Sequence, residues 1–294
     1  MFAVDKLISY TVRNISTQNI STYQHINAKH INISTYQHIN ITHPTITLTP
    51  PVPIMPEINE TNRNLFAQYT IEEKQRLYQA ATELYSENKR QLFDRLVLNR
   101  TRHICVVLED IFQSHNASAV LRSCDCFGVQ DIHVVENRNR YAPNSDVSMG
   151  SDKWVDYYKH PSILQTYDEL RAKGYRIIAT LPHENDTLIT DLDISQPTAL
   201  VFGTELTGLT PEAIDHADGY VKVPMYGFTE SFNISVCAAL SLFYLTEKMR
   251  ANPAINWRLT EEEQITLKLY WSMQVIHDGR RVMEHISANL FGNR

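Results

Sequence analysis

Cysteine is scarce in this sequence. Only four are present among its 294 residues, at Cys105, Cys124, Cys126 and Cys237. This number, with irregular spacing, is too small for a disulfide framework, and the single residue between Cys124 and Cys126 is not the spacing of a zinc knuckle. We interpret all four as reduced thiols, which indicates a cytoplasmic protein.

Long apolar runs and an excess of positive charge are also absent. No uninterrupted apolar stretch reaches the ~18 residues that a membrane helix needs, and Asp5 and Lys6 interrupt the apolar start of the chain. We therefore expect neither a membrane span nor a secretory signal. The formal net charge is −6, whereas nucleic-acid-binding proteins usually carry a basic footprint. Any RNA-binding site must therefore be a local patch.

Residues 1–55 differ in composition from the rest of the chain. The nonapeptide NISTYQHIN occurs twice, at residues 19–27 and 32–40, in a segment rich in Asn, Ser, Thr, Gln and His that ends in a cluster of prolines. Such a stretch cannot bury much apolar surface, so it is predicted to be disordered. We interpret it as an accidental extension, with Met55 as a plausible true start.

Helices are predicted on both sides of a central region. In the N-terminal helical region, residues 56–102, apolar residues recur at three- and four-residue spacing, which indicates amphipathic helices. Thr70 followed by Glu73 is a capping-box signal. Thr260 gives the same signal in the C-terminal extension, residues 252–294, which is predicted to contain one or two helices.

A group of cations lies at the end of the N-terminal helical region. These side chains form either a solvated helix face or a patch for RNA phosphates. They are Lys89, Arg90, Arg95, Arg100 and Arg102.

Residues 103–251 are predicted to form an α/β domain. Short β-runs alternate with helical segments, which indicates a parallel sheet covered by helices on both faces. Ligands then bind beyond the carboxyl ends of the strands. The predicted strands are 103–109, 131–136, 176–181, 198–203 and 219–224, and the predicted helices are 116–127, 162–173, 211–216 and 233–250.

The first motif lies within SHNASAVLRSCDCFGV, residues 114–129. Asn116 follows the first predicted strand and is expected to cap the next helix. Arg122 lies further along this helix among mostly apolar neighbours, where a guanidinium needs an anionic partner. From the residues alone, this partner is either a structural carboxylate, Asp125 or Glu109, or a bound ligand.

Two turn-rich loops follow later strands. In FGTELTG, Gly203 and Gly208 permit sharp turns and close approach to a ligand, although any loop between a strand and a helix can have this composition. In VPMYGFTESFNIS, Ser231 or Asn233 is either a plain N-cap for the next helix or part of a site. The glycine loop does not match the GxGxxG fingerprint of dinucleotide-binding proteins.

In this order, the motifs resemble the SPOUT class of RNA methyltransferases, and within it the tRNA guanosine 2′-O-methyltransferase family. The resemblance covers roughly residues 100–250. Asn116, Ala119 and Arg122 match N-x-x-A-x-x-R, the loop from Gly203 through Glu205 to Gly208 matches G-x-E-x-x-G, and residues 223–235 match I-P-M…S-L-N-V-S, with Val223 and Phe232 as apolar replacements. Further matches are residues 150–155, Thr180 and residues 217–225.

The resemblance implies a reaction and a fold. The reaction is S-adenosylmethionine-dependent 2′-O-methylation of a tRNA ribose, with guanosine 18 of the D-loop as the expected target. It needs no metal, and RNA rather than DNA follows from the 2′-hydroxyl. The implied fold is of SPOUT type with a C-terminal trefoil knot, flanked by N- and C-terminal helices. The implied assembly is a homodimer, in which the apolar helix 237–245 serves either the interface or the core.

The resemblance also assigns roles to individual residues. Arg122 would hold the target phosphate or stabilise the developing alkoxide. The other implied catalytic residues are Asn116, Glu205, Ser231 and Asn233. The implied cofactor-binding residues are Thr180, Leu181, Gly203, Thr204, Glu205, Val223, Met225, Phe232 and Asn233.

Other functions remain open. A 2′-O-methyltransferase acting on ribosomal RNA or on the tRNA wobble nucleotide would differ in the helical region 57–100. A non-catalytic RNA-binding protein with a vestigial cofactor pocket is disfavoured by the intact motif residues. A metabolic enzyme on a doubly wound sheet fits least, because the chain lacks a Gly-rich phosphate loop and a convincing nucleophile–base pair.

Overall fold

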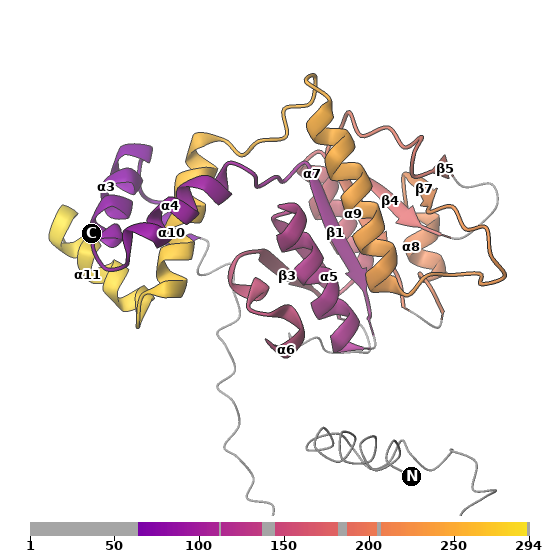
Figure 1. The fold of residues 1–294 in the computed structure, drawn as a ribbon, viewed down its shortest axis with the longest axis horizontal. Coiled ribbons are helices and arrows are strands. Elements are labelled where there is room, and N and C mark those ends of the chain that lie inside the picture. Colours follow the sequence, from indigo (N-terminus) through magenta and orange to yellow (C-terminus); the bar gives the residue numbers. More distant parts are fainter. Residues whose placement is uncertain (1–63, 112, 137–144, 182–186, 205–206, 293–294) are drawn as a thin grey trace, which may run out of the picture. The chain divides into compact units, whose positions relative to one another are not determined.

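The computed structural model describes residues 64–292, apart from residue 112 and the segments 137–144, 182–186 and 205–206. These residues form a parallel α/β domain and a group of helices drawn from both ends of the described chain (Figure 1). The predictions for residues 1–55 lie outside the described residues. No helix in the described ranges is long and apolar enough to cross a membrane.

A seven-stranded sheet forms the centre of the α/β domain within the described ranges. Every neighbouring pair of strands is parallel, and the strand order is β3-β2-β1-β6-β4-β7-β5. All carboxyl ends therefore lie at the same edge. The strands are β1 (Ile104–Glu109), β2 (Asp131–Val135), β3 (Asp156–His160), β4 (Arg176–Thr180), β5 (Thr187–Leu188), β6 (Thr198–Phe202) and β7 (Gly219–Lys222).

The five predicted strands are confirmed, but the sequence did not predict β3 and β5. Both are edge strands. The sequence of β3, DYYKH, has no apolar run. Its buried polar groups are tolerated because they have hydrogen-bond partners. Asp156 accepts a hydrogen bond from Arg102 at 2.7 Å, and the rings of His133 and His160 share a hydrogen bond of 2.9 Å.

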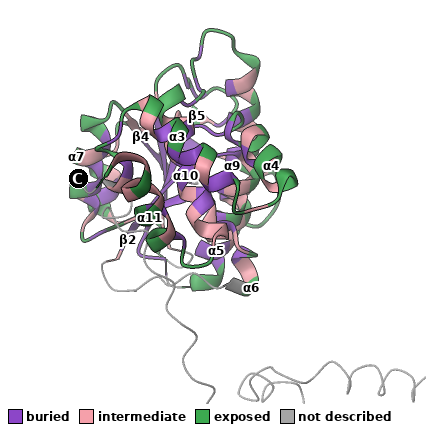
Figure 2. Cartoon of the chain, turned by 90° about the vertical axis from the view of Figure 1, so that its left-hand side faces the viewer, coloured by how far each residue is buried: buried purple, intermediate pink, exposed green. Residues whose placement is uncertain are grey.

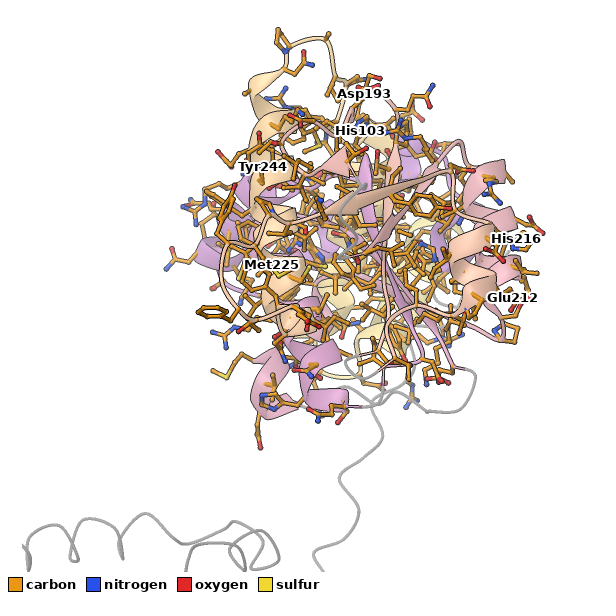
Figure 3. The ribbon with its side chains drawn as sticks, turned by 90° about the vertical axis from the view of Figure 1, so that its right-hand side faces the viewer. His103, Asp193, Glu212, His216, Met225 and Tyr244 are labelled. Carbon is orange, nitrogen blue, oxygen red and sulfur yellow. The ribbon has the colours of Figure 1, made fainter. Side chains whose placement is uncertain are left out.

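Helices cover both faces of the sheet, as predicted. Alternate residues of β1 divide between the two apolar cores, with Val106 on one face and Val107 on the other. Figure 3 shows Tyr244 of α9 and Glu212 of α8 on opposite sides of the view, and Figure 2 shows the strands largely buried. The covering helices are α5 (Ser114–Phe127) and α9 (Ile234–Ala251) on one face, and α7 (Ile163–Ala172) and α8 (Pro211–Asp215) on the other.

The remaining helices pack around two further apolar clusters. Both predicted capping boxes are confirmed, with Thr70 starting α3 and Thr260 starting α10. Phe93 and Trp271 lie at the centre of the second cluster, 5.4 Å apart between ring centroids. The helices are η3 (Asn64–Phe66), α3 (Ile71–Thr82), α4 (Glu87–Val97), α10 (Glu261–Val275) and α11 (Gly279–Phe291). Two short elements, α6 (Ser145–Ser148) and η4 (Ser151–Lys153), lie between β2 and β3.

Arg102 joins the sheet to α10. Its guanidinium pairs with Asp131 of β2, with Asp156 of β3 at 2.7 Å, and with Glu263 of α10 at 3.4 Å. Burial lowers the pKa of Arg102, but the two aspartates outweigh this effect and raise it overall. The guanidinium therefore stays charged and neutralises carboxylates that are almost buried.

Replacing Arg102 with methionine would leave Asp131 and Asp156 without their cation. Because removing one partner of a buried ion pair leaves an uncompensated charge, we expect the free energy of unfolding to fall by roughly 3 kcal/mol, measured by urea denaturation. The control is Arg280→Met on α11, whose pair with Glu284 is about half exposed and should change stability by less than about 0.5 kcal/mol. Equal effects in the two variants would contradict a structural role for the Arg102 pairs.

Candidate functional site

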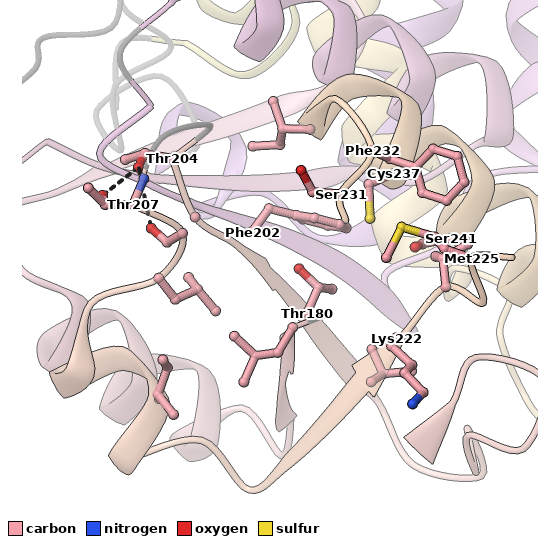
Figure 4. A pocket seen from close by; sticks show the side chains of 18 residues that line it. Thr180, Phe202, Thr204, Thr207, Lys222, Met225, Ser231, Phe232, Cys237 and Ser241 are labelled. Atoms are coloured by element: carbon pink, nitrogen blue, oxygen red, sulfur yellow. Dashed lines mark hydrogen bonds between the residues drawn. The ribbon is translucent and has the colours of Figure 1, made fainter. Parts of the chain in front are cut away.

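A pocket of about 360 Å³ lies at the carboxyl ends of the neighbouring strands β4, β6 and β7 (Figure 4). This is the edge at which open parallel sheets bind ligands. Seven of the nine predicted cofactor-binding residues line it, together with Ser231, which was predicted to be catalytic. The seven are Thr180, Leu181, Gly203, Thr204, Val223, Met225 and Phe232.

The loop after β6 closes tightly on itself. Thr204 and Gly208 exchange two backbone hydrogen bonds of 3.0 Å, and the Thr207 N–H donates to Oγ1 of Thr204 at 3.1 Å. A Cβ on Gly203 would lie 2.2 Å from the carbonyl carbon of Gly208. The backbone of Gly208 has a φ of +68°, in the left-handed region. Glycine is therefore required at both positions. Glu205, predicted to be both catalytic and cofactor-binding, lies outside the described residues.

The loop after β7 ends at the N-cap of α9. Oδ1 of Asn233 accepts a hydrogen bond from the Ser235 N–H at 2.9 Å, so Asn233 rather than Ser231 is the cap. Its Nδ2 donates to Oδ1 of Asn116 at 3.3 Å, across 117 residues of sequence. The first and third motifs therefore meet at the N-termini of α5 and α9. Asn233 itself is not in the pocket wall. All the other described residues that were predicted to bind the cofactor are.

Asn116 is not the cap of its helix, contrary to the prediction. Helix α5 begins at Ser114 with Gln113 as N-cap, so Asn116 lies in the first turn. Its side chain is buried, and its Nδ2 donates to Oε1 of Gln113 at 3.3 Å. The Asn116 amide is thus fixed between Gln113 and Asn233.

Arg122 is exposed, not buried among apolar side chains as its neighbours had indicated. Within the described ranges, its guanidinium makes no hydrogen bond or ion pair. The two carboxylates considered as its partners are engaged elsewhere, because Asp125 pairs with Arg100 and Glu109 accepts hydrogen bonds from Thr210. Arg122 is not part of the pocket wall, and its donors face solvent.

The sequence did not predict every residue of the pocket wall. Lys222, Cys237 and Ser241 also line it. Cys237 and Ser241 lie three and seven residues after Ile234, on one face of α9, so helical periodicity counted from the third motif could have found them. Burial raises the pKa of the Cys237 thiol, opposed in part by the Ser241 hydroxyl. The thiol therefore stays protonated and is a poor nucleophile.

The cations predicted to bind RNA fall into two groups. Lys89, Arg90 and Arg95 lie on α4, where Arg90 and Arg95 are exposed. Arg100 is 4% exposed and pairs with a carboxylate of α5, and Arg102 pairs with three carboxylates. Arg100 and Arg102 are thus engaged in ion pairs within the protein, whereas Arg90 and Arg95 are exposed.

The fold and the pocket define an α/β protein whose ligand site is built by loops at the carboxyl edge of a parallel sheet. Residues 103–243 match the SpoU rRNA Methylase family. A protein of Borreliella burgdorferi named tRNA (guanosine(18)-2′-O)-methyltransferase is 38% identical over 195 residues, which are 66% of this chain and 89% of that protein. This chain belongs to the same family of SpoU methylases, which confirms the resemblance drawn from the three motifs.

Other relatives match over similar lengths. A protein of Aquifex aeolicus with the same name is 30% identical over 204 residues, covering 68% of this chain and 96% of that protein. The crystal structure of the A. aeolicus TrmH/SpoU tRNA modifying enzyme aligns with a TM-score of 0.59 and 28% identity, covering 65% of this chain and 98% of that chain. The match extends over nearly the whole of these relatives.

Two substitutions separate the helix cap at Asn233 from its contact with Asn116. Asn233→Asp keeps an acceptor for the Ser235 N–H but loses the donor to Asn116, so its stability should stay within about 0.5 kcal/mol of the wild type. Asn233→Ala loses both contacts and should lower the free energy of unfolding by about 1 kcal/mol. Denaturant unfolding measures both values, and equal losses would show that the Asn116 contact, not the cap, carries the stability.

Proposed function

We propose that this protein transfers a methyl group from S-adenosylmethionine to the ribose 2′-hydroxyl of guanosine 18 in tRNA. The observation that carries the proposal is the pocket wall, in which the second and third motifs meet at the end of β4. Relatives named for this reaction match almost their full length. The resemblance of the motifs to the same family supports the assignment independently of overall similarity.

The pocket suits the cofactor in composition. Leu181, Phe202 and Leu209 supply apolar surface for a buried ring system, and the tight loop after β6 brings backbone polar groups to the wall. This combination of apolar lining with a few placed polar groups is typical of cofactor sites. When bound, the cofactor supplies an electrophilic methyl group on a positively charged sulfur. The residues of the chain then have to align an oxygen with that carbon and exclude water.

Arg122 is the proposed contact for the reacting ribose. Its exposed guanidinium carries donors that suit a phosphate or a developing alkoxide. A guanidinium does not lose its proton at neutral pH, so the proton of the 2′-hydroxyl would pass to phosphate or water. Asn116 and Asn233 act by holding the N-termini of α5 and α9 together, and Ser231 and Glu205 complete the proposed catalytic set.

Lys89, Arg90 and Arg95 are the proposed contacts for the RNA backbone. They lie on α4, outside the α/β domain. Arg90 pairs at 3.1 Å with Glu87, and both partners are about half exposed. Such a surface pair contributes little stability, so a phosphate group can replace the carboxylate without a large loss.

The proposal includes pairing of two copies through α9. One face of this helix is buried in the core, including Leu242 and Leu245, while the opposite face leaves Val236, Leu240 and Phe243 between 41% and 55% exposed. Apolar residues at four- and three-residue spacing form a continuous stripe on a helix, and an exposed stripe favours a protein interface. The C-terminal trefoil knot of the SPOUT fold belongs to the same proposal, supported by the convergence of the carboxyl ends of β4, β6 and β7 on one pocket.

Methyl transfer from labelled S-adenosylmethionine to an unmodified tRNA transcript tests the reaction. We expect 2′-O-methylguanosine at position 18, located by mass spectrometry, and no product with a transcript carrying adenosine there. Arg122→Ala should lower kcat/KM by roughly 100- to 1,000-fold, because one preorganised donor is lost. Since Arg122 is exposed, the melting temperature should change little.

Arg281→Ala on α11 is the control for this experiment, since Arg281 is also exposed and lies on a helix outside the proposed site. It should retain wild-type activity. Transfer to ribosomal RNA or to the wobble nucleotide instead would keep the chemistry and overturn the substrate. Absence of S-adenosylmethionine binding in calorimetry would favour a non-catalytic RNA-binding protein.

Light scattering tests the proposed pairing through α9. Leu240→Asp places a charge in the exposed stripe, where burial against a second copy would be costly. We expect a dimer for the wild type and a monomer for the variant, with unchanged secondary structure. Leu84→Asp on the loop after α3 is a matched control, because Leu84 is 53% exposed and lies outside the stripe. A monomeric wild type would contradict the pairing.

A further inference from the structure

Glu109 is a buried carboxylate at the last position of β1. Its side chain is 1% exposed, and within the described ranges it has no lysine, arginine or histidine partner. Both of its oxygens accept hydrogen bonds from Thr210: Oε2 from the N–H at 2.9 Å and Oε1 from the hydroxyl at 2.6 Å. A carboxylate without a cation is costly to bury, so these two donors are the contacts that make it tolerable there.

Thr210 connects this carboxylate to the cofactor loop. Its Oγ1 caps α8 by accepting a hydrogen bond from the Ala213 N–H at 3.1 Å. With one lone pair used by the cap, the hydroxyl hydrogen is directed at Glu109. The residue before Thr210 is Leu209, which lines the pocket together with Gly208 and Thr207. The position of Thr210 therefore sets where the loop ends.

The contact spans 101 residues of sequence and joins two parts of the proposed site. Glu109 ends the strand that leads into α5, which carries Asn116 and Arg122. Thr210 ends the loop whose closure depends on the paired backbone groups of Thr204 and Gly208. Glu109 itself is not in the pocket wall, so it does not touch the ligand.

We infer that Glu109 is a positioning residue, which sets the affinity of the pocket for the cofactor by fixing the end of the loop after β6 through Thr210. This inference rests on the proposed function, because it takes the pocket to bind S-adenosylmethionine. A neutral amide of the same shape cannot replace the carboxylate. If glutamine accepts from the Thr210 N–H, its NH₂ group faces Oγ1, and the hydroxyl hydrogen loses its acceptor.

Glu109→Gln tests the inference by titration calorimetry with S-adenosylhomocysteine. We expect its dissociation constant to rise roughly tenfold. Amide hydrogen exchange at Thr204 and Gly208 should become faster, because the end of the loop is released. The midpoint of denaturant unfolding should stay the same or rise, since the substitution removes an unpaired charge from the interior. A residue with only a structural role would change stability and not affinity.

Asp218→Asn is the matched control. Oδ2 of Asp218 accepts a hydrogen bond from the Ile177 N–H at 2.7 Å, and Oδ1 pairs with Arg171. Asp218 thus also holds a strand to a following segment, but it is not in the pocket wall. This variant should lose stability and retain the wild-type affinity for S-adenosylhomocysteine.

Thr210 provides a second route to the same answer, should Glu109→Gln fail to fold. Thr210→Ser keeps the hydroxyl and should bind as the wild type does. Thr210→Val keeps the N–H bond to Glu109 but loses the hydroxyl bond and the cap of α8, so it should bind more weakly. The double variant of Glu109→Gln and Thr210→Val should bind no more weakly than the weaker-binding of the two single variants. Both substitutions remove the same hydrogen bond from the Thr210 hydroxyl.

The outcomes separate the two proposals. A wild type that does not bind S-adenosylhomocysteine would overturn the proposed function. A wild type that binds it, with Glu109→Gln and Thr210→Val binding equally well and exchanging at the same rates, would overturn the role of Glu109 and leave the function standing.

Discussion

The whole arrangement depends on one constraint, which is that all strands of the described sheet run in parallel. Their carboxyl ends lie at a single edge, so segments that are distant in sequence are brought together there. Parallel strands also require crossover connections, and these place helices on both faces. Most of the interior strands are therefore largely apolar, and the pocket is built where they end at this edge.

Short-range hydrogen bonds hold the described parts of those loops in place. The loop after β6 closes through the backbone pair of Thr204 and Gly208, and the loop after β7 ends in the cap made by Asn233. Longer contacts then relate the loops to β1 and α5, through Thr210 to Glu109 and through Asn233 to Asn116. The pocket is thus formed by loops whose ends are fixed on the sheet, as binding sites generally are.

The sequence predicted the helices and strands whose hydrophobic pattern lies within a single segment. Apolar β-runs identified the five interior strands of the sheet. The edge strand β3 was missed because its buried polar groups, Asp156 and His160, are satisfied by partners on other segments. The same limit explains the cations. Their clustering near position 100 indicated an RNA patch, yet the carboxylates that engage Arg100 and Arg102 lie at least 25 residues away in sequence. Resemblance to a family supplied the pocket residues, but it could not supply Cys237 and Ser241, which follow from the orientation of α9.

Net charge and RNA binding are reconciled by the distribution of these pairs. The formal charge of −6 belongs to the whole chain, whereas a phosphate group responds to charges within a Debye length, about 8 Å at physiological ionic strength. Carboxylates such as Asp131 and Asp156 are neutralised internally by Arg102, so they contribute little repulsion at the surface. An exposed guanidinium that has no ion-pair partner among the described residues, such as that of Arg122, keeps its attraction for a phosphate. Binding of a polyanion by this acidic chain therefore depends on where its exposed cations lie and not on the net charge.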